Sequence, residues 1–85
     1  MATTITELDG SEGWSAEVVA TGVDFTLQCQ GPGRLLVQGA ASAPGATAGG
    51  LRLEDGWAVN RNDIPSGGIY YRPVNGQKVT VVLVT

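Results

Sequence analysis

Glycine-containing turn signals recur at short spacing along the whole chain, and this feature limits the fold more than any other. They lie at residues 9–10, 21–22, 31–33, 55–56, 66–68 and 75–76. The intervals between them suit short strands, and the thirteen glycines of the chain would interrupt a helix in most windows. We therefore expect an all-β fold, a small antiparallel β-sandwich or barrel, with no helix longer than one turn.

Alternating apolar residues between the turns mark the expected strands. The clearest run is residues 23–29, where every odd position is apolar and every even position is polar. Further strands are expected over residues 14–18, 35–38, 51–53, 57–60, 69–72 and 78–84. This gives about seven strands, a usual number for a small sandwich. A chain of 85 residues is one domain's worth, so we expect a single β domain over residues 1–85.

Two of the turns predict β-hairpins. Asn75-Gly76 separates residues 70–74 from residues 77–84, and both turn residues tolerate positive φ. A two-residue type I′ turn is therefore expected to pair the last two strands. Asp55-Gly56 is expected to play the same role between the two short strands that flank it.

The segment 39–50, GAASAPGATAGG, differs in composition from the rest of the chain. It consists wholly of Gly, Ala, Ser, Thr and Pro, so it has no bulky side chain to anchor it in a core. We expect a long surface loop. Two interpretations stay open: a flexible connector between the halves of the sandwich, or a docking arm that becomes ordered on a partner.

Charge and composition exclude several functional classes. Eight acidic residues against five basic ones give a net charge of −3, and the Arg and Lys residues are scattered singly, so no nucleic-acid surface is expected. The absence of histidine removes the usual partner of a Ser or Cys nucleophile and the commonest metal ligand, so hydrolytic triads and zinc sites are not expected. The first ten residues lack a basic region and an apolar stretch, so neither a signal peptide nor a membrane span is predicted.

Cys29 continues the apolar alternation of residues 23–29, where a small hydrophobic side chain would lie. As the single cysteine of the chain, it cannot form an intrachain disulfide. We expect a buried, unreactive thiol. A small domain without disulfides also fits assembly in a reducing cytoplasm better than secretion.

The acidic residues suggest two possible activities, hydrolysis of a glycosidic bond and calcium binding. Glu54, Asp55 and Asp63 lie close in sequence, and two carboxylates across a cleft can hydrolyse a glycosidic bond, although so small a domain leaves little room for such a cleft. Residues 9–12 contain Asp9, Ser11 and Glu12, which could ligate calcium but match no complete loop pattern. We expect these side chains to be ordinary turn residues. The chain is predicted to be no enzyme and to hold no cofactor or metal.

The aromatic residues divide into expected core and expected surface. Trp14 and Trp57 alternate in phase with neighbouring apolar residues, which predicts burial. Tyr70 and Tyr71 are adjacent and must face opposite sides of a strand, so one of them is expected at a surface or interface. An exposed aromatic side chain can stack on a sugar ring or anchor a protein contact, and the sequence does not choose between these.

The last strand is apolar on both faces. Residues 79, 81 and 83 are Val, Val and Leu on one face, while Val82 and Val84 lie on the other. Burial of both faces requires a second layer of this domain or another subunit. We therefore take Val82, Val84, Tyr70 and Tyr71 as candidate interface residues and expect a homo-oligomer.

The carboxyl-terminal part of the chain resembles the small virion structural proteins of tailed bacteriophages. The resemblance covers residues 51–85 and rests on four features: a Gly-containing turn before Trp57, the segment Ile-Pro-Ser-Gly-Gly at 64–68, the strand at 69–72, and a Val-rich final strand. It implies a β-sandwich that decorates or cements a capsid by bridging major capsid subunits. It also implies that the oligomer is a trimer, since shells offer threefold positions.

The resemblance implies a virion protein that is made and assembled in the cytoplasm of the bacterial host, with the major capsid protein or another virion protein as its partner. No nucleic-acid or membrane partner is expected. Two alternatives remain open. The chain could be a carbohydrate-binding module that stacks Tyr70 or Tyr71 and one Trp on a glycan, or a tail-associated accessory or adhesin domain.

Overall fold

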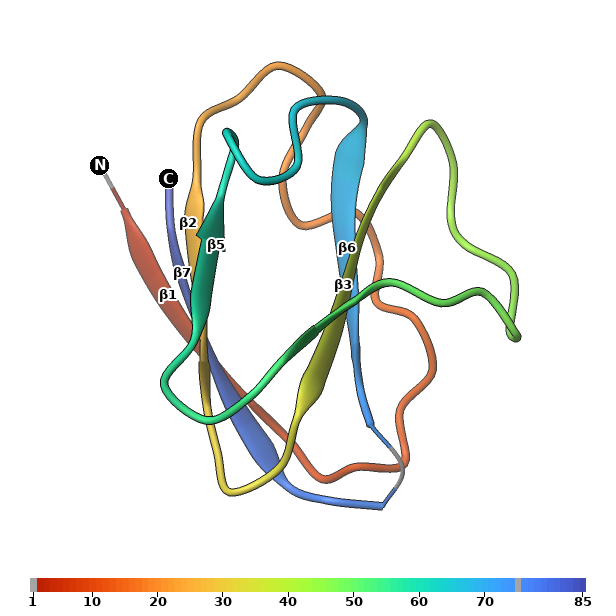
Figure 1. The fold of residues 1–85 in the computed structure, drawn as a ribbon, viewed down its shortest axis with the longest axis vertical. Helices are drawn as coiled ribbons and strands as arrows, with labels where there is room; N and C mark the ends of the chain where they lie inside the picture. Colours follow the sequence, from red (N-terminus) through yellow and green to blue (C-terminus); the bar gives the residue numbers. More distant parts are fainter. Residues whose placement is uncertain (1, 75) are drawn as a thin grey trace.

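The computed structural model describes residues 2–74 and 76–85, which form seven β-strands and no helix. The strands are β1 (Thr3–Leu8), β2 (Thr26–Gln30), β3 (Leu35–Ala40), β4 (Leu51–Leu53), β5 (Ala58–Asn60), β6 (Gly68–Pro73) and β7 (Val79–Val84). They pair into two antiparallel sheets (Figure 1). Sheet A has the order β1-β7-β2-β5, and sheet B has the order β4-β3-β6. The prediction of a small all-β domain with about seven strands is confirmed.

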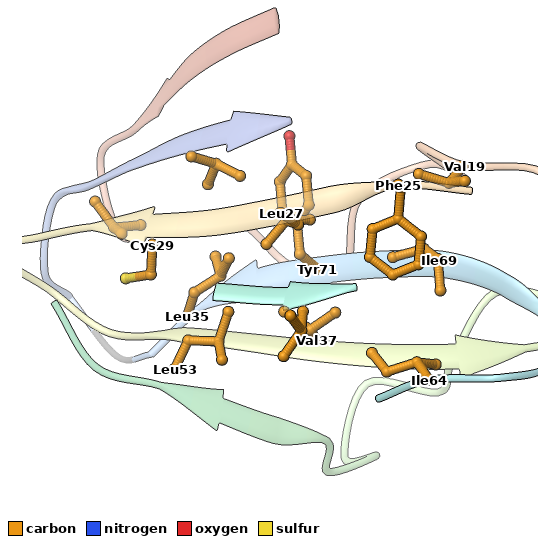
Figure 2. Packing of buried hydrophobic residues seen from close by; sticks show 13 residues of the cluster. Val19, Phe25, Leu27, Cys29, Leu35, Val37, Leu53, Ile64, Ile69 and Tyr71 are labelled. Atoms are coloured by element: carbon orange, nitrogen blue, oxygen red, sulfur yellow. The ribbon is translucent and has the colours of Figure 1, made fainter. Parts of the chain in front are cut away.

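Both sheets contribute side chains to one hydrophobic core (Figure 2). Leu27 of β2, Leu35 of β3 and Ile69 of β6 are completely inaccessible to solvent. Along β2 the alternation is exact to the residue, because Leu27 and Cys29 are buried while their neighbours in the strand are not. Burial of one such aliphatic side chain stabilises the fold by about 1.5–3 kcal/mol, so the core is the main source of stability.

The amino-terminal part of the chain differs from the prediction. Residues 14–18 form no strand, whereas β1, which the sequence did not predict, pairs with β7 along its whole length. Residues 15–19 instead run along the edge of β6 that does not pair with β3. The N–H of Ser15 donates to the Tyr71 carbonyl at 2.8 Å, and the N–H of Val18 donates to the Ile69 carbonyl at 2.9 Å. The apolar alternation in residues 14–18 therefore belongs to an irregular segment that is hydrogen-bonded to β6.

The strand predicted over residues 23–29 is shorter than expected. β2 begins at Thr26, and Val23 is 43% exposed in the preceding loop. Phe25 is nevertheless buried, which explains why the apolar alternation continues beyond the hydrogen-bonded strand. The remaining predicted strands are observed with ends shifted by at most two residues.

Both predicted hairpins are wrong. β6 belongs to sheet B and β7 to sheet A, so these two strands do not pair and the connection between them joins the two sheets. Asn75 lies outside the described residues, and Gly76 has φ +73° and donates its N–H to the Gly10 carbonyl at 3.0 Å. The crossing has a physical reason, since β6 is already flanked by β3 and by residues 15–19, which leaves no free edge for β7.

The turn at Asp55-Gly56 exists but also links the two sheets. The N–H of Trp57 donates to the Glu54 carbonyl at 3.0 Å, and Gly56 has φ +87°. The strand before this turn, β4, lies in sheet B, and the strand after it, β5, lies in sheet A. The turn residues thus determine a local reversal of the chain, but they do not determine which strands pair.

The small-residue loop is shorter than the predicted 39–50. β3 continues through Ala40, and the loop covers residues 41–50, most of which are exposed. Figure 1 shows it extending away from the two sheets between β3 and β4. Gly39 belongs to the strand because it pairs with Ile69 of β6. A side chain would not fit there, since a Cβ at residue 39 would lie 2.5 Å from the Ser66 carbonyl oxygen.

Candidate functional site

An apolar patch lies on the outer face of sheet A. Val79 and Val81 of β7 are buried in the core, so Val82 and Val84 point away from it. The register places Ile5 of β1 directly opposite Val82. Ile5 is 66% exposed, and both valines are half-buried. We call Ile5, Val82 and Val84 the outer apolar patch; two of its three members were predicted from the sequence.

The patch adjoins the open edge of β1. β1 pairs with β7 on one side, and this ladder is extended by two hydrogen bonds between Ala2 and Thr85, at 2.8 and 2.9 Å. Within residues 2–74 and 76–85, no hydrogen bond reaches the other side of β1. The other three sheet edges are protected: β4 and β5 have three residues each, and residues 15–19 cover β6. An unprotected edge strand is a template for pairing with another chain.

The sequence of β1 favours such pairing. The strand TTITEL contains β-branched residues at four of its six positions, and it has no proline and no lysine. Natural proteins use those two residue types to protect an edge strand. Neither β1 nor Ile5 was identified from the sequence, because Thr hides the apolar alternation on which strand prediction depends.

The two tyrosines do not lie at the surface. Tyr70 is 5% exposed and Tyr71 is 7% exposed, so the prediction that one of them is exposed is wrong. They do face opposite sides of β6, since Tyr71 belongs to the core cluster and Tyr70 does not. Tyr70 is buried on the outer face of sheet B, which two loops approach: the Arg72 side chain on this face contacts both Trp14 and Ala46.

The tryptophans also depart from the prediction of burial. Trp57 precedes the edge strand β5 and is 57% exposed, and Trp14 is half-buried. Leu51, on the edge strand β4, is 48% exposed. An alternating pattern predicts which face of a sheet a side chain lies on. It does not predict burial at a sheet edge, where a side chain has a neighbouring strand on one side only. Trp57 is therefore an exposed aromatic residue that the sequence did not identify as such.

Each of the three acidic residues considered for catalysis has a separate structural role. Glu54 pairs with Arg34, with 2.7 Å between the carboxylate oxygen and Nε. Asp55 accepts a hydrogen bond from the Gly31 N–H at 2.8 Å, and Asp63 accepts one from the Asn60 N–H at 2.9 Å. These carboxylates stabilise turns.

The residues considered for calcium bind the backbone of their own turn. Asp9 accepts hydrogen bonds from the Ser11 hydroxyl at 2.6 Å and the Ser11 N–H at 2.8 Å, and these bonds lower the pKa of the Asp9 carboxyl. Glu12 accepts from the N–H groups of Asp9 and Gly10. Among residues 2–74 and 76–85, no group of three or more His, Cys, Asp or Glu residues could hold a metal ion.

Cys29 is a free, buried cysteine, as its position in the alternation predicted. Its thiol lies 3.5 Å from the Gly33 carbonyl oxygen, to which it donates. Burial raises the pKa of the thiol above its usual value, which favours the unreactive protonated form.

Comparisons with protein-family models, with curated proteins and with solved structures found no match to this chain. In the part of the chain that the structure describes, no helix is long and apolar enough to cross a lipid bilayer. The candidate site is accordingly defined by its own geometry: the outer apolar patch and the edge of β1 beside it.

Proposed function

We propose that this chain is a structural, non-enzymatic virion protein that decorates or cements a capsid by bridging major capsid subunits. The observation that carries the proposal is the open edge of β1 next to the outer apolar patch. An enzyme is recognised by convergent chemical groups, whereas a binding domain needs an accessible surface that can form backbone bonds and bury apolar side chains. The outer side of sheet A offers both.

The proposed contact has two components. A strand of the partner adds to β1, and the backbone hydrogen bonds fix its direction and register. Removal of Ile5, Val82 and Val84 from water then supplies the hydrophobic contribution. Because many copies bind the assembled shell and not its free subunits, each copy stabilises the shell by mass action, to an extent set by its occupancy.

Self-association through the same region is part of the proposal. A domain of 85 residues buries a modest fraction of its surface, and the patch offers further apolar area for burial against a second copy. We favour a trimer, because the capsid shell that the resemblance implies offers threefold positions.

The exposed indole of Trp57 supports a second candidate function, carbohydrate binding. An exposed aromatic ring can stack on a sugar, and this side chain is 57% exposed. The tyrosines proposed for such a platform are buried, so Trp57 would act without them. A tail-associated accessory or adhesin domain would use the same residue. Binding to a glycan array that is lost in Trp57→Ala would favour this candidate over the capsid function.

Sedimentation with purified particles tests the capsid function. The wild-type protein should co-sediment with intact particles of the phage that encodes it. Ile5→Asp, which places a charge in the outer apolar patch, should reduce bound protein at least tenfold. Leu51→Asp is the matched control, since Leu51 is 48% exposed but lies in sheet B. Failure of the wild-type protein to co-sediment, or equal binding of Ile5→Asp, would contradict the proposal.

A further inference from the structure

A second cluster of polar side chains lies on the outer face of sheet B. Arg72 of β6 and Gln38 of β3 point away from the core, because Tyr71 and Val37 beside them belong to it. Trp14, which directly precedes the segment 15–19 that runs along β6, also lies on this face. The Arg72 guanidinium lies over its ring, 5.9 Å from the ring centre. The proposed capsid contact uses none of these residues.

The small-residue loop 41–50 extends away from the sheets (Figure 1) but reaches this cluster at two points. Arg72 Nη1 donates a hydrogen bond to the Ala46 carbonyl at 2.9 Å. At the other end of the loop, a Cβ on Gly50 would lie 3.4 Å from Cη2 of Trp14. The loop therefore binds the guanidinium at its middle and ends close to the indole.

Three polar atoms of the cluster are buried without a hydrogen-bond partner among the described residues. They are the donors Arg72 Nε and Trp14 Nε1 and the acceptor Gln38 Oε1. A buried donor or acceptor that forms no bond is unfavourable, and a charged donor more so. Within residues 2–74 and 76–85, the structure has one ion pair, between Arg34 and Glu54. Arg72 therefore has no carboxylate partner among these residues. The closed arrangement thus leaves the cation underpartnered.

The loop can leave this face at low cost. Most of its residues are exposed, and it has no large side chain that would lose burial. The hydrogen bond from Ala48 N–H to the Gly45 carbonyl, at 3.0 Å, lies within the loop and would move with it. Opening therefore requires the loss of the Arg72–Ala46 bond and few other contacts.

We propose that residues 41–50 are a lid over a binding site for an acidic side chain presented by a peptide. A guanidinium binds a planar carboxylate through two parallel hydrogen bonds from adjacent N–H groups, either Nε with Nη2 or Nη1 with Nη2. Arg72 Nε has no partner in the closed arrangement, and opening of the lid frees Nη1. The adjacent acceptor Gln38 Oε1 suits a peptide N–H beside that carboxylate. One half-buried cation, Arg72, in a chain of net charge −3 favours a singly charged group over a phosphate. The proposal is independent of the capsid function.

An NMR titration of the whole protein tests the site directly. The probes are acetyl-Ala-Glu-Ala-amide, its Gln counterpart and sodium acetate, and the signal is the Nε–H resonance of Arg72. We expect the Glu peptide to shift this resonance saturably, and both other probes to bind at least tenfold more weakly. Equal binding of the Gln peptide would overturn the carboxylate assignment, and equal binding of acetate would overturn the peptide assignment.

Two variants separate this site from general attraction to positive charge. Arg72→Met keeps an unbranched apolar stem beside Trp14 and should weaken binding of the Glu peptide at least tenfold. Arg52→Met is the matched control, because Arg52 and Arg72 both flank Leu36 on this face but Arg52 is exposed. Arg52→Met should change binding less than twofold. Equal losses in both variants would overturn the proposal; if Arg72→Met does not fold, the wild-type Nε–H resonance decides.

Elastase tests the lid, since this protease cuts after small residues and the loop contains four alanines. Saturation with the Glu peptide should increase the rate of cleavage within residues 41–50 several-fold. An unchanged or lower rate would show that the loop does not open to admit the peptide.

Discussion

Replacement of Arg61 is expected to destabilise the domain strongly, because this side chain ties two loops together. Its Nε and Nη2 donate to the Val23 carbonyl at 3.0 and 2.8 Å, and Nη2 also donates to the Ala20 carbonyl at 3.0 Å. Nη1 donates to the Gly67 carbonyl at 2.9 Å and to the Ile64 carbonyl at 3.4 Å. The guanidinium lies 5.0 Å from the ring centre of Phe25. Thus Arg61 joins the loop before β2 to the loop before β6.

The size of the effect follows from these bonds. A hydrogen bond to a charged group contributes about 1.5–3 kcal/mol. Four carbonyls depend on Arg61, those of Ala20, Val23, Ile64 and Gly67. Most of these bonds are exposed to water and they act together, so we expect a loss of about 3 kcal/mol in Arg61→Met and not the full sum. A domain of this size has a total stability of roughly 4–13 kcal/mol. The loss should lower Tm by about 12–24 °C.

Urea unfolding followed by tryptophan fluorescence, with calorimetry for Tm, measures this loss. Arg61→Lys separates the planar donor geometry from the charge: one ammonium cannot reach all four carbonyls, so it should recover less than half of the lost stability. Arg52→Met, at an exposed position of β4, should stay within about 0.5 kcal/mol of the wild type. A loss below about 1 kcal/mol in Arg61→Met, or full recovery with Lys, would refute the reasoning.

Three further predictions concern the patch, one turn and the thiol. Val82→Lys and Val84→Lys should leave the circular dichroism spectrum unchanged but weaken self-association in sedimentation; a monomeric wild type would exclude the oligomer. Gly76→Val should cost about 1–2 kcal/mol in urea unfolding because φ is +73°, whereas Gly13→Val, which meets free space, should cost less. Cys29 should resist iodoacetamide at pH 8 unless the chain is unfolded. Since burial raises the pKa of its thiol from 9.0, the buried protonated thiol contributes fully to the free energy of unfolding below that pH, and this contribution declines above it. Rapid labelling of the folded chain would contradict this.

Local patterns in the sequence predicted the strands whose side chains reach the core. The alternation at residues 23–29 identified β2, and Leu27 and Cys29 are buried as that pattern requires. β1 escaped prediction because it is an edge strand whose side chains stay largely exposed, so its sequence carries no apolar alternation. Strand pairing also escaped prediction, because it depends on which edges are free once distant segments have met.

The same limit applies to the candidate site. The period of two in the last strand correctly separated Val82 and Val84 from the core-facing residues of β7. The sequence could not show that Ile5 joins them, since this depends on the long-range register between β1 and β7. Nor could it show that Tyr70 is buried, because burial on the outer face of a sheet depends on segments whose course no local pattern describes.

The position of β7 between β1 and β2 has a consequence for how the chain folds during synthesis. Thr3 pairs with Val84 and Leu8 with Val79, so the first strand has no partner until the last one has been made. The entropy of closing so long a loop must be overcome before these contacts form, which places folding in the range of about milliseconds to seconds. During translation, the β-prone segment TTITEL therefore remains unpaired until all the later strands have been made. A chaperone or an unwanted strand would first bind to this segment.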